Sequence, residues 1–158
     1  MEFCMKAKEI MVTVVPTISK KASIKEAVLM LKNNFGDESF VNAAPGLIVV
    51  NENGELAGIL TPLTLITALL ENAGHEKNKL PTSAKFYDSL CKNIQDRLVE
   101  EFMERQPISV TEDALLLDVA ELFVQHKFHR VPVVRDKKVV GIIYRTPLLF
   151  FIAKCFFK

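Results

Sequence analysis

The chain has 158 residues, of which 49% are apolar and 25% charged, and its formal net charge at neutral pH is +1. This length fits one domain, or two small halves that share a core, and the composition is that of an ordinary soluble globular protein. A charge so close to zero does not favour a nucleic acid or an anionic membrane as partner. No apolar run reaches the roughly 18 residues that span a bilayer, and the N-terminus lacks the apolar core of a signal peptide.

The cysteines are Cys4, Cys91 and Cys155, which are scattered along the chain without CxxC spacing. An odd number at such spacing argues against a disulfide framework and against a zinc site. Three free, mostly buried thiols fit a reducing compartment. We therefore predict a cytoplasmic protein without a membrane span.

In chain order, the first predicted elements are a short strand at 17–18 and a helix at about 23–34. Ser23 and Glu26 have the spacing of a capping box, in which the serine hydroxyl and the glutamate satisfy free amides at the start of a helix. Apolar residues follow at the spacing i, i+3, i+4, i+7, which is the buried face of an amphipathic helix. The first helix is therefore predicted to cover a sheet with one face.

A hairpin and a second helix come next. The strands "GLIVV" (46–50) and "LAGIL" (56–60) flank the turn "NENG", whose Asn-Gly step is a strong hairpin signal. The helix begins near Thr61, because a threonine cap followed by proline in the first turn is a favoured start. A linker at 72–98 starts polar and then becomes helical, with an apolar stripe of Phe86, Leu90, Ile94 and Leu98.

The remaining chain repeats the first part. Met11 and Met103 are 92 positions apart, and the same offset carries the apolar face of the first helix onto a second one, at about 115–127. At "LIVV" and "VPVV" the offset falls to 84, so the first copy has about eight extra residues in a loop near 35–44. The second copy therefore has the same predicted elements: a strand at 109–110, the helix, strands "RVPVV" and "VVGII", and a helix that starts near Thr146 and Pro147 with a threonine cap. We expect its apolar end, "PLLFFIAKCFF", to be a buried helix.

Two copies of strand-helix-strand-strand-helix predict a mixed α/β (α+β) fold. Neither half buries both faces of a sheet alone, so the halves should pack against each other. The predicted organisation is a first repeat at 1–71, a linker with a helix at 72–98, and a second repeat at 99–158.

These residues resemble a known family. "TIS…ASIKEAVLML…LIVVNENGELAGILT" and "ISV…DVAELFVQHKFHRVPVVRDKKVVGII" together are similar to a tandem pair of CBS domains, the unit called a Bateman module. The resemblance implies two repeats packed pseudo-symmetrically through their sheets, with clefts between them for adenine nucleotides or related adenosyl ligands. It also implies a homodimer, and a conformational signal to a regulated protein that the sequence does not identify.

The family's nucleotide-binding phrase is glycine, two apolar residues, Thr or Ser, two variable residues and Asp, and this chain departs from it. In the first copy Thr61 is present, but Thr64 stands at the Asp position. In the second copy Tyr144 replaces the hydroxyl residue and Pro147 stands at the Asp position. Neither copy keeps the carboxylate that accepts hydrogen bonds from ribose.

Other residues favour a ligand. The resemblance places His129 and Arg130 at ligand phosphates, for which a planar guanidinium and an imidazole are suited. It places Val15, Thr17 and Ile108 at the base, although core and turn positions are the plainer interpretation of those three. The acidic cluster Glu100, Glu101 and Glu104 is predicted to be a solvated helix face.

No catalytic set is evident, so we predict that the protein is not an enzyme. His126 and His129 have HxxH spacing but no third zinc ligand nearby in the sequence. The leading hypothesis is a free-standing sensor that binds AMP, ADP, ATP or S-adenosylmethionine between its repeats and requires no cofactor. The alternative is a ligand-free interaction module that uses the apolar C-terminal helix to pair with itself or with a partner.

Overall fold

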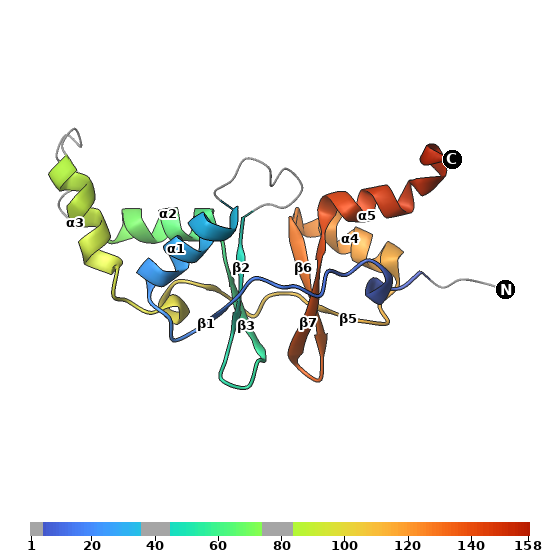
Figure 1. The fold of residues 1–158 in the computed structure, drawn as a ribbon, viewed down its shortest axis with the longest axis horizontal. Coiled ribbons are helices and arrows are strands. Elements are labelled where there is room, and N and C mark those ends of the chain that lie inside the picture. Colours follow the sequence, from blue (N-terminus) through green and yellow to red (C-terminus); the bar gives the residue numbers. More distant parts are fainter. Residues whose placement is uncertain (1–4, 36–44, 74–83) are drawn as a thin grey trace.

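The computed structural model describes residues 5–35, 45–73 and 84–158. Figure 1 shows two hairpins, β2–β3 and β6–β7, side by side in the middle of the molecule. The helices α1, α2 and α3 lie on one side of this pair, and α4 and α5 lie on the other. The two halves therefore meet through their sheets, as predicted.

The first half follows the predicted order. Strand β1 runs parallel to β2, and β2 pairs antiparallel with β3 across the Asn-Gly turn. Gly54 of this turn has φ +77°, a backbone conformation that glycine adopts without strain. The bounds are β1 (Thr17–Ser19), α1 (Ile24–Phe35), β2 (Leu47–Val50), β3 (Leu56–Leu60) and α2 (Pro62–Glu71).

The second half repeats this plan after the linker helix α3 (Ala84–Ile94). Strand β5 runs parallel to β6, and β6 pairs antiparallel with β7. Short 3-10 helices, η1 (Ala7–Glu9) and η3 (Val99–Glu101), precede the two copies. The bounds are β5 (Val110–Thr111), α4 (Leu116–His126), β6 (Arg130–Arg135), β7 (Lys138–Tyr144), α5 (Arg145–Ile152) and η4 (Lys154–Phe157).

The predicted helix starts are confirmed in both copies to within one residue. The Ser23 hydroxyl accepts a hydrogen bond from the Glu26 amide at 3.1 Å, and the Thr61 side chain caps α2. In the second copy the predicted threonine cap was wrong, because α5 begins at Arg145 and Thr146 lies inside its first turn. Tyr144 takes the N-cap position and makes no side-chain capping bond.

Each half is completed by the segment that leads into the other copy, which periodicity did not predict. Strand β4 (Glu104–Arg105) comes before the second copy but pairs antiparallel with β3 of the first. In the same way, Val12 precedes the first copy but bridges Ile142 of β7, through backbone hydrogen bonds of 2.8 and 3.0 Å. The two lead-in segments are thus exchanged between the halves.

This exchange explains why both copies carry a glycine in their last strand. A Cβ atom at Gly58 would lie 2.6 Å from the sulfur of Met103, and one at Gly141 would lie 2.7 Å from the sulfur of Met11. Each methionine stands on the lead-in segment of one copy and covers the glycine of the other. The absence of a side chain lets the segment approach the sheet closely.

The core has three parts. One cluster lies under the helices of the first half and another under those of the second, and Val99 and Ala7 are fully buried in them respectively. Between the sheets lies a third cluster, formed by Ile48, Ile59 and Ile142. The hairpin tips also join, since the Leu56 amide donates to the Lys137 carbonyl at 3.0 Å.

Two burial predictions were wrong. The C-terminal run is not a buried helix: Leu148 is buried, but Leu149, Phe150 and Phe156 are exposed, the last at 82%. Cys91 and Cys155 are exposed free thiols rather than buried ones, and Cys4 lies outside the described residues. The predicted loop near 35–44 lies outside them too, apart from its first residue. Within the described ranges, no helix has the length and apolarity to cross a membrane.

Candidate functional site

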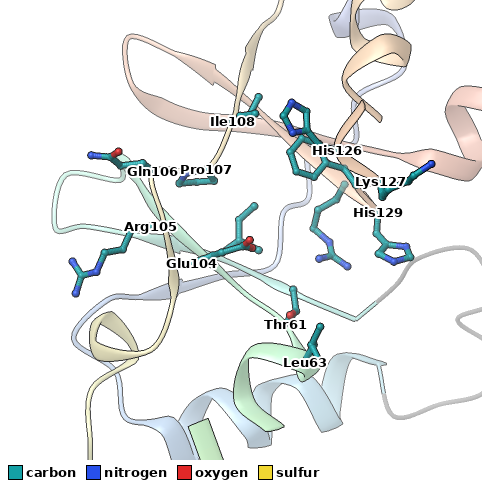
Figure 2. A pocket seen from close by; sticks show the side chains of 13 residues that line it. Thr61, Leu63, Glu104, Arg105, Gln106, Pro107, Ile108, His126, Lys127 and His129 are labelled. Atoms are coloured by element: carbon teal, nitrogen blue, oxygen red, sulfur yellow. The ribbon is translucent and has the colours of Figure 1, made fainter. Parts of the chain in front are cut away.

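A cleft of about 510 Å³ opens between the two halves. Three chain segments line it: the junction of β3 and α2, the segment 104–108 that contains β4, and the turn from α4 into β6. Figure 2 shows Thr61 and Leu63 at one end of the cleft and Ile108 and His126 at the other. The cleft is therefore shared between the repeats, as the resemblance implied.

Four of the predicted site residues line this cleft together. They are Thr61 from the first repeat, and Ile108, His129 and Arg130 from the second. Each follows from the local fold. Thr61 ends β3 and caps α2, whereas His129 and Arg130 stand where the chain leaves α4 and enters β6. The exchange of β4 brings Ile108 across to the first repeat.

Arg130 lies deepest in the cleft wall and is only 6% exposed. Its Nη2 donates to the carbonyl of Pro45 at 3.1 Å, across the boundary between the halves. Burial lowers the pKa of Arg130, while the nearby Tyr144 and Glu104 act to raise it. The guanidinium nevertheless stays charged, because arginine does not deprotonate in proteins. It gives the cleft a fixed cation.

His129 is exposed and has cationic neighbours. Burial of part of the ring lowers the pKa of His129 below 6.5, and the charges of Arg145 and Arg130 lower it further. The imidazole is therefore mainly neutral at pH 7, with one nitrogen as donor and the other as acceptor. Lys127 adds a further positive charge to the same wall.

Arg145, which the sequence analysis missed, holds the turn that carries these residues. Its Nε donates to the carbonyl of Phe128 and its Nη2 to that of Lys127, both at 2.8 Å. Lys127 has φ 59° and ends α4 in the left-handed conformation. An arginine beside the carboxyl end of a helix satisfies free carbonyls and matches the helix dipole. Its position directly after the last strand was the available signal.

Thr64 is turned toward Thr61 rather than toward the cleft. The two hydroxyl oxygens are 3.0 Å apart, and the Thr64 amide donates to the Thr61 hydroxyl at 3.3 Å. Thr64 lines a neighbouring hollow, together with Thr61, Glu101 and Glu104. The residue at the family's Asp position thus supports the helix cap.

Besides Thr64, four predicted site residues do not line this cleft. Val15 and Tyr144 pack against the isoleucine cluster between the sheets, and burial raises the pKa of Tyr144. Thr17 lies on β1, pairs with Ile48 of β2, and is exposed. Pro147 lies in the first half of α5. Their ligand roles stay predictions from the resemblance.

Glu104 lines the cleft, although we predicted a solvated helix face for it. Glu100 and Glu101 do lie in the 3-10 helix η3, where they form ion pairs with Lys21 at 2.6 Å and Arg97 at 2.9 Å. Glu104 instead lies on β4, opposite Ile59. The prediction was wrong because the pairing of β4 with β3 joins segments far apart in the sequence. Among the described residues, no group of three or more His, Cys, Asp or Glu side chains lies close enough to hold a metal ion.

The sequence profile of the CBS domain matches residues 7–71 and 99–153. The chain is 28% identical over 143 residues to an uncharacterised protein of Methanocaldococcus jannaschii, a match that covers 90% of this chain and 41% of that protein. It is 30% identical over 139 residues to the uncharacterised protein YlbB of Bacillus subtilis, covering 87% of this chain and 76% of the relative. The chain thus spans less than half the length of the archaeal relative.

Solved structures share the fold. CBSX2 in complex with AMP superposes with a TM-score of 0.68 at 22% identity, covering 96% of this chain and 98% of the other. The CBS domain pair of protein MJ0100, in complex with 5′-methylthioadenosine and S-adenosyl-L-methionine, gives 0.67 at 26% identity, with the same coverage. The two matched segments, the pseudo-symmetric halves and these neighbours agree: the chain belongs to the CBS domain family and contains a tandem pair of CBS domains.

Proposed function

We propose that the protein is a regulatory module that binds an adenine nucleotide or a related adenosyl ligand in the cleft between its repeats. The observation that carries this proposal is the buried cation Arg130 in the cleft wall, with His129 and Lys127 beside it. Charged donors of this kind make strong hydrogen bonds to phosphate or carboxylate oxygens. The related structures contain AMP in one case and 5′-methylthioadenosine with S-adenosylmethionine in the other.

The cleft also provides for the base. Ile108, Pro107 and Phe128 supply apolar and aromatic surface, which is the usual lining of a small-molecule site. A ligand that contacts Thr61 of the first repeat and Arg130 of the second bridges the halves. Such a ligand stabilises whichever arrangement of the halves fits it best, and this differential affinity is the regulatory signal. The role proposed is regulatory rather than catalytic, and the regulated protein is to be identified.

Arg130→Ala tests the proposal by calorimetric titration with AMP, ADP, ATP and S-adenosylmethionine. Loss of a charge-assisted bond should weaken the ligand by about 1–3 kcal/mol. Arg105→Ala is a matched control, because Arg105 also lines the cleft but is exposed and donates to the Glu100 carbonyl at 2.9 Å. Equal affinities of wild type and Arg130→Ala would exclude Arg130 from the site, and no binding of any of the four would overturn the function.

Homodimerisation is part of the proposal, and pairing alone is the second candidate function. The helices α2 and α5 carry exposed apolar side chains at Leu63, Ile66, Leu70, Leu149 and Phe150. Exposed apolar surface on this scale marks interaction sites. We expect a dimer in sedimentation equilibrium, and Leu149→Glu should dissociate it. A dimer that binds no ligand would favour the interaction module.

The exposed thiols of Cys91 and Cys155 support a reducing location, the cytoplasm.

A further inference from the structure

Glu104 has an unusual place in the cleft. It is the one acidic residue among the described residues that line it, and the cleft also contains Arg105, Lys127 and Arg130. Its charge acts on that of Arg130. Its strand partner is Ile59, two residues before Thr61. Figure 2 shows Glu104 and His129 on different sides of the cleft, with Thr61 below them. The carboxylate therefore lies near both the cation and the helix cap.

The oxygens of Glu104 are available to a ligand. Within the described part of the chain, no hydrogen bond or ion pair engages them, unlike those of Glu100 and Glu101 on the preceding 3-10 helix. Glu104 also borders the neighbouring hollow, where Thr64 lies. The Thr64 hydroxyl lies at hydrogen-bond distance from the Thr61 hydroxyl. Neither Thr61 nor Thr64 therefore offers a ligand a negatively charged acceptor at this end of α2.

A carboxylate favours the parts of a nucleotide that donate hydrogen bonds, which are the ribose hydroxyls and the adenine amino group. An ionised carboxylate only accepts hydrogen bonds, and it repels phosphate oxygens. The ribose hydroxyls are neutral donors, and they stand between the phosphate and the base. A single acid close to a cationic wall is thus suited to the ribose, while Arg130 and His129 are suited to the phosphate.

We infer that Glu104 accepts hydrogen bonds from the ribose hydroxyls of the bound nucleotide and makes the cleft selective for ribonucleotides over deoxyribonucleotides. This inference rests on the function proposed above. It assigns the ribose acceptor to β4, which belongs to the lead-in segment of the second repeat. The ligand would therefore hold β4 against β3, at the place where the halves exchange their segments.

The test is a calorimetric comparison of AMP with 2′-deoxy-AMP and 3′-deoxy-AMP. The wild type should prefer AMP by about tenfold or more, the effect of one hydrogen bond to a charged group. In Glu104→Gln this preference should fall severalfold through loss of AMP affinity, because a neutral amide oxygen is a weaker acceptor than a carboxylate. Glu71→Gln is the matched control, since Glu71 lines the neighbouring hollow but not the cleft, and it should keep the preference. A thermal melt confirms that each variant is folded.

Two results would overturn the inference and leave the proposed function standing. One is equal binding of AMP and both deoxy analogues by the wild type. The other is tighter binding of all three by Glu104→Gln, which would show that the carboxylate only repels phosphate. Absence of binding by all three nucleotides would overturn the inference and the AMP function together.

Discussion

The guanidinium of Arg130 lies over Gly46, its own counterpart in the first repeat. A Cβ atom at Gly46 would be 2.5 Å from Nη1 and 2.6 Å from Cζ of Arg130. The two positions are 84 residues apart, the offset that relates the two strands. One repeat thus supplies the cation and the other supplies the space for it. The pseudo-symmetric halves are specialised at this pair.

We predict that Gly46→Ala displaces Arg130, since the new methyl group would overlap its guanidinium. The loss of the bond to Pro45 and the local overpacking should lower the free energy of unfolding by about 1–2 kcal/mol in urea denaturation. In an Arg130→Ala background the same change should cost much less, because the clash is gone. Additive effects in this double-mutant cycle would show that the two residues do not interact.

The two strand glycines should differ in their tolerance of alanine. At Gly58 a Cβ atom would meet the Met103 side chain and also the backbone oxygen of Glu104 at 2.7 Å, which cannot move alone. At Gly141 it would meet only the flexible side chain of Met11. Overpacking costs about 1–3 kcal/mol, so Gly58→Ala should lie at the upper end and Gly141→Ala at the lower. Thermal melts of the two variants compare them directly, and the reverse order would refute this account of the exchange.

Thr61→Ala should destabilise the protein by about 1 kcal/mol through loss of the α2 cap. Thr146→Ala is the internal control, because Thr146 also precedes a proline at a helix start but lies inside the first turn of α5 and is not its N-cap. Chemical denaturation should therefore separate two chemically identical changes. Equal costs would mean that the hydroxyl of Thr61 contributes nothing as a cap.

His129 should make stability depend on pH. Its pKa is lowered below 6.5 by burial and by the charges of Arg145 and Arg130, so the folded state binds this proton less readily than the unfolded state. Well above pH 6.5 His129 is neutral in both states and does not change the stability. As the pH drops through 6.5 the unfolded state binds the proton first, so the stability falls. Between pH 7.5 and pH 5.5 the melting temperature of His129→Gln should fall less than that of the wild type. Identical pH dependence in both proteins would show that His129 titrates normally.

A phosphate ligand should reverse the effect of those cations on His129. A bound dianion favours the protonated imidazole, so AMP should bind more tightly as the pH falls from 7.5 toward 6. His129→Gln should remove this pH dependence while Lys127→Gln should keep it. Titrations at the two pH values measure the change, and an unchanged slope in His129→Gln would place His129 outside the phosphate site.

Much of the fold was predictable from local pattern. The spacing of Ile24, Ala27 and Leu31 determined the first helix, and the Asn-Gly turn determined its hairpin, since these signals depend only on neighbouring residues. The threonine cap predicted for the last helix was wrong, because Tyr144 takes the N-cap position and Arg145 begins α5. The exposure of Phe156 was missed because apolarity alone does not show whether a surface covers it.

By itself the sequence determined the repeat, the order of elements and the family. Four of the predicted site residues, Thr61, Ile108, His129 and Arg130, also lie in one cleft. Only the tertiary structure decided which residues complete that cleft. Glu104 and Arg145 act through partners that are distant in the chain, and no periodicity records such pairings. The exchange of the lead-in segments places Glu104 in the cleft, because close packing on Gly58 brings its segment to the opposite sheet. Arg145 instead holds the turn that carries His129 and Arg130.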